Sequence, residues 1–164
     1  MINKILSRFI IALQKLLPIS FKINHKFQNH NQVTNLDIII TSLKNKNFEP
    51  EYIVDVGCFK GIWTNRLLKF FPYSKYILFD ADDKNIEYLD KLKSKNKNIE
   101  YRIKLLSDDE KDYEFFSMAS GSSIFEEQTN YSREIKKIKS SLLYNELPNE
   151  IKNIKSNLNK LDVQ

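Results

Sequence analysis

The middle of the chain alternates between short apolar runs and segments in which apolar residues recur at helical spacing. Three apolar runs are predicted strands: residues 52–56, residues 75–79 with Asp80 at their end, and residues 99–106. Helical spacing predicts helices over residues 61–71 and 83–95. In the second helix the inward residues are expected to be Ile86, Leu89 and Leu92. This β-α-β-α-β order calls for an α/β fold with a parallel sheet and right-handed crossovers.

Further elements flank this alternation. An amphipathic helix is predicted before it, over residues 33–46, because apolar residues again recur at helical spacing. After it, residues 113–118 are expected to form an antiparallel strand and residues 158–164 one more buried strand. The run from 132 to 147 fits either a strand or a helix, and both interpretations stay open.

The first 27 residues form a distinct basic segment without any acidic residue. Apolar residues from Ile2 to Leu17 lie at helical spacing, and Pro18 ends this predicted helix. Its longest apolar run, residues 9–13, is too short for a membrane span of about 20 residues. No small-residue cleavage site follows, which argues against a signal peptide. The helix is expected either to dock on its own domain or a partner, or to lie on an anionic membrane surface.

Composition is that of a globular protein, with 41% hydrophobic and 29% charged residues. The net charge of +5 comes mostly from lysines spread along the chain, so we expect no nucleic-acid partner. His25 and His30 have no cysteine nearby, and no metal site is expected. The single cysteine, Cys58, excludes an internal disulfide and fits a reducing compartment. We interpret Cys58 as a small turn residue rather than a reactive thiol.

Glycine is scarce and concentrated at one place. The chain has only 3 glycines, and two of them, Gly57 and Gly61, lie in one turn directly after the first predicted strand. Average usage would place about eleven glycines in a chain of this length. Glycines in such a sequence indicate positions where a side chain cannot fit. Because a strand, a glycine turn and a helix often place a small ligand against bare backbone, we expect a cofactor site here.

Three aspartates lie at the ends of predicted strands. Asp55 lies within the first strand, Asp80 ends the second, and Asp108 follows the third. Ligands of doubly wound sheets bind at the carboxyl ends of the strands, where the strand order reverses. Asp80 follows Asp55 by 25 residues, a spacing suited to a carboxylate that binds ribose hydroxyls, and Asp108 could then contact the base. In the alternative interpretation these aspartates only cap helices and turns.

The glycine turn indicates which ligand these carboxylates serve. Its spacing is Gly-x-x-x-Gly, not the Gly-x-Gly-x-x-Gly that lets backbone approach a pyrophosphate. Asp55 would repel a diphosphate and favour a ligand with ammonium and sulfonium charges, and the helix N-terminus at Gly61 offers N–H groups to a carboxylate. S-adenosylmethionine combines these groups and is the expected cofactor. The same features argue against a nucleotide-binding oxidoreductase.

Five motifs resemble, in the expected order, those of the FkbM-type S-adenosylmethionine-dependent methyltransferases. They span residues 50–164. The motifs are Val54-Asp55-Val56-Gly57-Cys58-Phe59-Lys60-Gly61-Ile62-Trp63-Thr64, Phe79-Asp80-Ala81-Asp82, Leu105-Leu106-Ser107-Asp108, Gly121-Ser122-Ser123 and Leu161-Asp162-Val163-Gln164. The resemblance implies a Rossmann-like class I methyltransferase fold with a doubly wound, mostly parallel sheet. Two departures are Ala81, where the family has proline, and the blurred element at residues 142–147.

Family members continue beyond the last motif. Residues 28–164 are therefore expected to be a partial methyltransferase domain, the cofactor-binding part, with its C-terminal part missing as in an N-terminal fragment. The last strand is expected to pair beside residues 52–56, with its far side unpaired.

The resemblance assigns eight residues to the cofactor. These are Asp55, Gly57 and Gly61 at the methionine end with Phe59 in the same turn, Asp80 at the ribose, Ser107 and Asp108 at the adenine, and Asp162 near the transferred methyl group. It implies methylation of a hydroxyl on a sugar or another small metabolite, with no general base assigned. We expect a cytoplasmic protein, peripheral at the inner face of the membrane if its N-terminal helix binds lipid. The alternative function is a non-catalytic remnant or an interaction module with a partner- or membrane-binding N-terminal helix.

Overall fold

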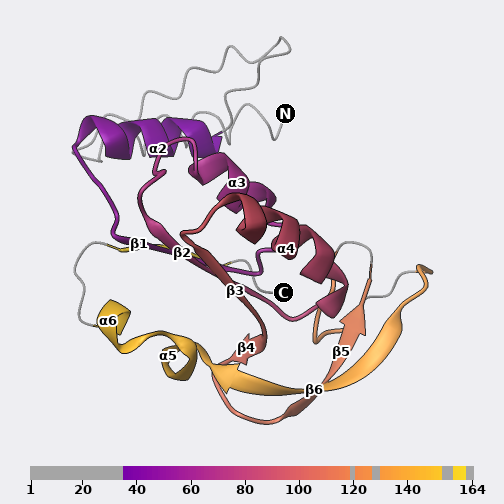
Figure 1. Ribbon diagram of the computed structural model, residues 1–164. Helices are drawn as coiled ribbons and strands as arrows, with labels where there is room; N and C mark the ends of the chain where they lie inside the picture. Colours follow the sequence, from indigo (N-terminus) through magenta and orange to yellow (C-terminus); the bar gives the residue numbers. More distant parts are fainter. Residues whose placement is uncertain (1–34, 119–120, 127–129, 153–156, 162–164) are drawn as a thin grey trace, which may run out of the picture. The chain divides into compact units, whose positions relative to one another are not determined.

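The computed structural model describes residues 35–118, 121–126, 130–152 and 157–161 (Figure 1). The chain divides between Ile38 and Ile39 into two compact units, and nearly all described residues belong to the second. The predicted N-terminal helix, the domain boundary after residue 27, and both histidines lie outside the described residues. Over the described ranges, no helix is long and apolar enough to cross a membrane.

Four parallel strands form the central sheet, in the order β3-β2-β1-β7. They are β1 (Tyr52–Val56), β2 (Lys75–Asp80), β3 (Ile99–Ile103) and β7 (Asn157–Leu161). Every residue of β1 is buried, as expected for a parallel strand covered on both faces. The predicted α/β class with a parallel sheet is confirmed.

The last strand pairs where it was expected. β7 lies parallel to β1, with Tyr52 opposite Asn157 and Val56 opposite Leu161. Among the described residues no strand lies beyond β7, so it forms one edge of this sheet and β3 forms the other. The predicted strand also included residues 162–164, which lie outside the described residues.

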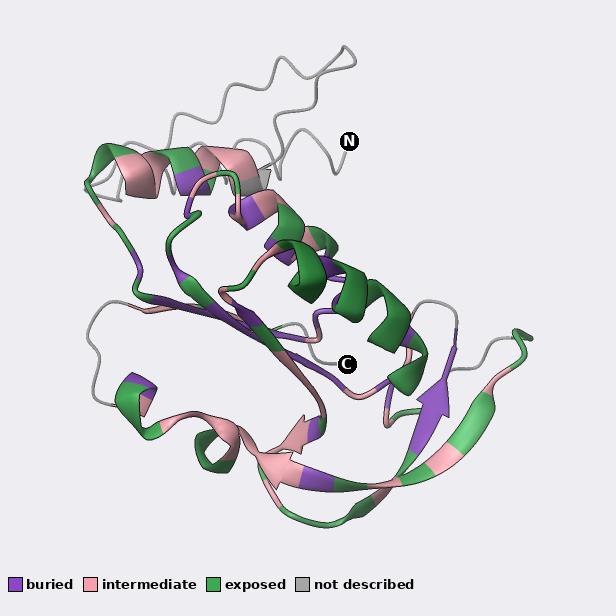
Figure 2. Cartoon of the chain, viewed as in Figure 1, coloured by how far each residue is buried: buried purple, intermediate pink, exposed green. Residues whose placement is uncertain are grey.

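Helices cover both faces of the central sheet (Figure 1). α3 and α4 lie on one side, and α5 and α6 lie on the other. The helices are α2 (Asn35–Asn45), α3 (Ile62–Leu67), the 3-10 turn η1 (Asp83–Asn85), α4 (Ile86–Lys95), α5 (Leu143–Glu146) and α6 (Asn149–Lys152). Buried residues follow the central strands, while the outer side of α4 is exposed (Figure 2).

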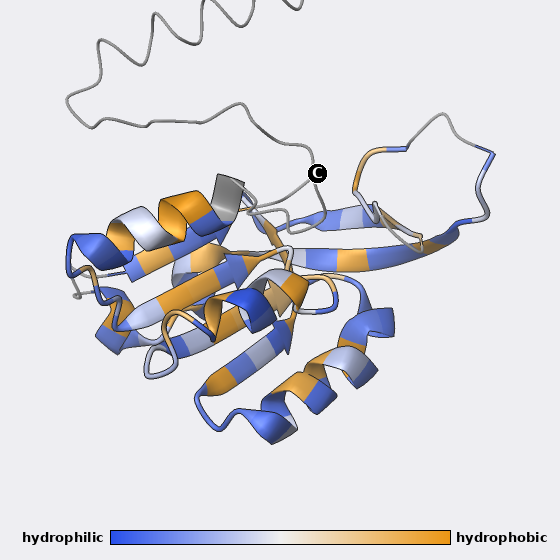
Figure 3. Cartoon of the chain, turned by 90° about the horizontal axis from the view of Figure 1, so that it is seen from above, coloured by the Kyte–Doolittle hydropathy of each residue, from blue (hydrophilic) through white to orange (hydrophobic). Residues whose placement is uncertain are grey.

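The alternation of side chains along the strands divides the core into two layers. Val54, Val56 and Phe79 face one way and pack with Ile151 of α6, and the partly buried Leu143 and Leu147 complete that layer. Alternate residues of the same strands, such as Ile53 and Leu78, are fully buried on the opposite face. Each such buried side chain stabilises the fold by about 1.5–3 kcal/mol. Hydrophobic residues accordingly recur along the strands and along the helices (Figure 3).

Two helix predictions need correction. α3 ends at Leu67 rather than at residue 71, because the amides of Phe70 and Phe71 both bond to the Leu67 carbonyl in a turn. The predicted helix over 83–95 begins with η1, and α4 starts only at Ile86. Ile86 is 38% exposed, not inward, because the change from 3-10 to α geometry falls at this residue and shifts the helical period. Leu89 and Leu92 are buried as predicted.

The third predicted strand is broken at Lys104. The Lys104 amide donates to the Asp80 carbonyl at 2.7 Å, and beyond this point the chain leaves the central sheet. The next segment, β4 (Leu105–Ser107), belongs to a second sheet of three strands in the order β4-β6-β5. One continuous strand over residues 99–106 was therefore a wrong prediction.

The second sheet is completed by β5 (Asp112–Ser117) and β6 (Glu134–Leu142). β5 is antiparallel to β6, which confirms the antiparallel strand predicted near residues 113–118. β4 is parallel to β6. The run from 132 to 147, which fitted either strand or helix, contains both: β6 is followed directly by α5.

We expect Gly61→Ala to lower the free energy of unfolding by about 1–3 kcal/mol. Gly61 has φ of +70°, and a Cβ there would lie 2.6 Å from Leu92 Cδ2. Denaturant titration would measure the loss. Asn47→Ala is the control with a smaller expected loss, because Asn47 is exposed and already carries a Cβ at φ of 55°. A loss in Gly61→Ala no larger than in Asn47→Ala would contradict the need for glycine at position 61.

Candidate functional site

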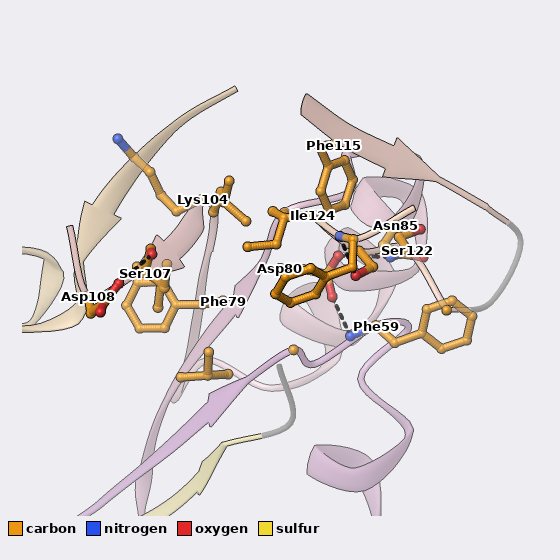
Figure 4. A pocket seen from close by; sticks show the side chains of 18 residues that line it. Phe59, Phe79, Asp80, Asn85, Lys104, Ser107, Asp108, Phe115, Ser122 and Ile124 are labelled. Atoms are coloured by element: carbon orange, nitrogen blue, oxygen red, sulfur yellow. Dashed lines mark hydrogen bonds between the residues drawn. The ribbon is translucent and has the colours of Figure 1, made fainter. Parts of the chain in front are cut away.

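A cavity of about 530 Å³ lies at the carboxyl ends of β1 and β2 (Figure 4). Its volume falls within the range of small-molecule sites. The cavity adjoins the point where the strand order reverses, since β2 and β7 flank β1 on opposite sides. It is lined by Val56, Gly57, Phe59, Phe79, Asp80, Ala81, Asn85, Lys104, Leu105, Leu106, Ser107, Asp108, Phe115, Gly121, Ser122, Ser123, Ile124 and Phe125. Half of these side chains are apolar, which is typical of a site for a small organic ligand.

The Asp80 carboxylate accepts three hydrogen bonds in the cavity wall. One oxygen, Oδ2, accepts the backbone N–H of Phe59 at 2.6 Å. The other, Oδ1, accepts the N–H of Asp82 at 2.9 Å and the side-chain amide of Asn85 at 3.0 Å. Asp80 is 9% exposed, so these three bonds replace most of its hydration. The carboxylate therefore fixes the turn after β1 to the end of β2.

The turn after β1 is folded back onto β2 by its backbone. The amides of Gly57 and Cys58 both donate to the Phe79 carbonyl, at 2.9 and 3.0 Å. Gly57 has φ of 70°, and Phe59 adopts the left-handed region with φ of 51°, which is uncommon for a residue with a side chain. The bond from Phe59 N–H to Asp80 offsets the cost of that conformation. At the cavity this turn presents Gly57, which has no side chain, and Phe59.

Asp55 does not line the cavity. Its carboxylate is fully buried on the α3 face of the sheet, where Oδ2 accepts the Thr64 hydroxyl at 2.7 Å. Lys160 Nζ of β7 lies 3.1 Å from Oδ1 and donates to the Gly57 carbonyl at 3.0 Å. A protein ammonium thus lies where the sequence analysis expected the ammonium of a ligand. The contact of Asp55 with a ligand stays a prediction.

Burial raises the pKa of the Asp55 carboxyl above its ordinary value. The positive charge of Lys160 and the hydrogen bond from Thr64 oppose that rise. Asp55 is therefore a structural ion-pair partner whose charge depends on Lys160. It links β1, α3 and β7 directly beneath the glycine turn.

Ser107 and Asp108 line the cavity at the end of β4. The Ser107 hydroxyl lies 3.1 Å from an oxygen of Asp108 and 3.5 Å from the Tyr113 hydroxyl. Among the described lining residues, the carboxylates are Asp80 and Asp108 and the one lysine is Lys104. These residues carry a formal excess of one negative charge, which favours a cationic or hydroxyl-rich ligand over a diphosphate.

Five of the eight residues assigned to a cofactor line this one cavity: Gly57, Phe59, Asp80, Ser107 and Asp108. Asp55 is buried behind it. Gly61 is not among the lining residues, and its role here is to let α3 begin against Leu92. Asp162 lies outside the described residues.

The sequence analysis assigned no ligand contact to one wall of the cavity. This wall consists of Phe115 on β5 and segment 121–125, which includes Ile124 and Phe125. The resemblance had singled out a small-residue loop at Gly121 to Ser123 but gave it no partner. Asn85 was missed as well, although its place shortly after Asp80, at the start of a helix, is a signal for a side chain that contacts a strand end.

Cys58 lies in the turn but is buried and 4% exposed. Burial raises the pKa of its thiol strongly, and the carboxylates of Asp80 and Asp55 add to that rise. Since the thiolate is the reactive form, this environment fits a turn residue rather than a nucleophile.

Across the described ranges, no group of three or more histidine, cysteine, aspartate or glutamate side chains is arranged to hold a metal ion. Comparison with models of protein families and with curated protein sequences found no match. The chemistry of the site must therefore be argued from its own residues.

Lys160→Met is expected to make stability fall more steeply with rising pH. Because the folded pKa of Asp55 is already raised, its ionisation weakens the fold as pH rises from the ordinary aspartate value through the folded pKa. Without Lys160, less opposes the effect of burial, so the folded pKa of Asp55 rises further. Each further unit of rise lowers the free energy of unfolding by about 1.4 kcal/mol at neutral pH. Urea titrations between about pH 4 and 7 would measure the difference from wild type.

The control for this experiment is Lys139→Met, which removes an exposed lysine of β6. Its difference from wild type should not vary with pH. A difference for Lys160→Met that stays constant over the same range would contradict the ion pair with Asp55.

We expect the Cys58 thiol to react at least about tenfold more slowly with an aromatic disulfide reagent in the native protein than in denaturant. Because Cys58 is the single cysteine, the release of one chromophore per chain reports on it alone. Equally fast labelling of native and denatured protein at pH about 8 would show that the turn exposes the sulfur.

Proposed function

We propose that this protein is an S-adenosylmethionine-dependent methyltransferase that methylates a hydroxyl of a sugar or another small metabolite. One observation carries the proposal. The Asp80 carboxylate joins the glycine turn to the end of β2 at a cavity that Ser107 and Asp108 also line. These are the residues that the resemblance to FkbM-type methyltransferases assigns to the cofactor.

The arrangement of the strands supports a Rossmann-like class I methyltransferase fold. The order β3-β2-β1-β7 repeats the 3-2-1-4 order with which doubly wound sheets begin, and helices lie on both faces. Dinucleotide-binding domains share this order, so the strands alone do not select a cofactor. The selection rests on the turn and its carboxylates.

The donor set at Asp80 suits a ribose. An ionised carboxylate offers about four acceptor positions, and three of them are taken by the N–H groups of Phe59, Asp82 and Asn85. One position remains for a ligand hydroxyl, and Asp80 lines the cavity. No side-chain cation pairs with this carboxylate among the described contacts, so its charge is balanced by N–H donors alone.

The part of the cavity between Asp80 and Asp108 suits an adenine. Phe79 and Leu106 supply apolar surface there, and Ile124 supplies it from the opposite wall. Asp108 can accept a hydrogen bond from an exocyclic amino group, and the Ser107 hydroxyl can donate to or accept from a ring nitrogen. An apolar slot with a few polar groups at its end is how small-molecule sites achieve orientation.

The structure changes one part of the assignment from the resemblance. Because Lys160 neutralises Asp55, we propose that the methionine end contacts the backbone of Gly57 and Phe59 rather than the Asp55 carboxylate. Gly57 leaves room for that approach because it has no side chain. Lys160 then supports the turn from beneath through the Gly57 carbonyl.

When bound, the cofactor supplies a methyl group on a sulfonium, which a hydroxyl oxygen can displace in line. The residues of this chain bind and orient, and their contribution to the rate is positioning and exclusion of water. Phe115 and Ile124 form an apolar part of the cavity lining that excludes water. Asp162, the residue expected near the transferred methyl group, lies outside the described residues, and no general base is assigned.

We expect isothermal titration to show one site per chain for S-adenosylmethionine and for its demethylated product, with Kd between about 1 μM and 1 mM. Asp108→Ala should weaken binding about tenfold, because it removes one charged acceptor from the cavity. Asp112→Ala is the control, since that exposed aspartate of β5 contacts Lys137 and lies outside the lining.

Folded protein, verified by circular dichroism, that binds NAD but neither adenosyl compound would contradict the proposal. An equal loss of affinity in Asp108→Ala and Asp112→Ala would contradict the assignment of Asp108 to the site.

A further inference from the structure

Asp82 is a buried carboxylate next to the cavity that the proposed chemistry does not use. It is 4% exposed, and its Oδ2 accepts the hydroxyls of Ser117 at 2.7 Å and Ser122 at 2.9 Å. Its Oδ1 accepts the backbone N–H of Lys84 at 3.1 Å. Asp82 follows β2, whereas its two serine partners lie 35 and 40 residues further along the chain.

The two serines lie in or next to the wall formed by Phe115 and segment 121–125. Ser117 is the last residue of β5, and Ser122 lies within the wall segment 121–125. The segment doubles back on β5, because Phe116 and Ser123 exchange backbone hydrogen bonds of 2.8 and 3.2 Å. The Ser122 hydroxyl also accepts the Met118 amide at 2.9 Å. Figure 4 shows Ser122 beside Asp80, with Ile124 and Phe115 near them and Ser107 and Asp108 on the other side of the view.

Asp80 and Asp82 together join three parts of the site. Asp80 binds the glycine turn, Asp82 binds the wall, and the Asp82 N–H donates to Asp80 Oδ1 at 2.9 Å. Two carboxylates at the end of one strand thus connect the glycine turn to segment 121–125.

Two ion pairs also join the residues after β2 to β6. Lys84 pairs with Glu134 at 3.0 Å, and Asp83 pairs with Lys136. Exposed ion pairs contribute little, whereas hydrogen bonds to a buried charged group are among the stronger ones. We therefore expect the bonds of Asp82, rather than these ion pairs, to hold segment 121–125 in place.

We propose that Asp82 is a positioning residue: through the hydroxyls of Ser117 and Ser122 it fixes segment 121–125 against the end of β2, where the segment lines the cavity, and so sets the affinity for the ligand. The identity of that ligand rests on the proposed function. The positioning of the wall does not, and it can be measured without any ligand.

The first test is amide hydrogen exchange by NMR on the full chain. In Asp82→Ala, the amides of Phe116 and Ser123 should exchange at least about tenfold faster than in wild type, because the segment that they join loses its anchor. The amides of Gly57 and Lys104, which bond to the β2 carbonyls, should keep their rates. Unchanged exchange at Phe116 and Ser123 would overturn the proposal, and so would an equal rise at all four amides.

Two further variants sharpen this test. Asp83→Ala is the matched control, because it removes a neighbouring exposed carboxylate that contacts the same second sheet through Lys136. It should leave all four amides unchanged. Asp82→Asn should restore most of the protection at Phe116 and Ser123, since an amide can still bond to serine hydroxyls. If Asp82→Ala does not fold, Ser122→Ala replaces it and should speed exchange of the Ser123 amide; no change there would overturn the proposal.

The second test is titration with the demethylated cofactor product. Asp82→Ala should raise Kd about tenfold and Asp83→Ala less than about twofold, with partial rescue in Asp82→Asn. Equal affinity in wild type and Asp82→Ala would overturn the link between wall and affinity. A third outcome is that wild-type protein binds no ligand while Asp82→Ala speeds exchange only at the Phe116 and Ser123 amides. That result would reject the proposed cofactor and would support the positioning role.

Discussion

The site depends on one buried carboxylate, Asp80 at the end of β2. A carboxylate removed from water is costly unless hydrogen bonds replace its hydration, and here the donors are the N–H groups of Phe59, Asp82 and Asn85. These donors come from three places: the turn after β1, the residues after β2, and the start of the helix that follows. Satisfying Asp80 therefore forces these segments together, and the cavity forms where they meet.

The neighbouring acids have separate roles because their partners differ. Asp55 is paired with Lys160 and Thr64 and stabilises the packing of β1 against β7 and α3. Asp82 binds two serine hydroxyls and, in our proposal, positions segment 121–125 at the cavity. Among the described residues, Asp80 alone combines burial, N–H donors only and a place in the cavity lining. Under the proposed function, a ligand hydroxyl would therefore meet a carboxylate that these donors orient.

The local sequence pattern was enough to predict the elements whose apolar residues follow a simple period. The apolar run Tyr52–Val56 predicted a buried parallel strand, and the glycine turn predicted bare backbone beside a cavity. Alternation within the same strand could also have placed Asp55, since its neighbours Val54 and Val56 face the α6 layer and Asp55 must face the other way. The local sequence pattern could not predict the break at Lys104 or the partners of Asp82. Both depend on hydrogen bonds between residues far apart in the chain, which leave no periodic signal.

The central claim is that a ribose hydroxyl and an adenine bind between Asp80 and Asp108, in the cavity that Asp80 organises. A crystal structure of the protein grown with saturating S-adenosylhomocysteine tests this most directly. The account predicts density for the adenosine in this cavity, with a ribose hydroxyl within hydrogen-bond distance of Asp80 and the adenine between Phe79 and Ile124. An empty cavity at saturating ligand, or an adenosine bound elsewhere on the molecule, would contradict it.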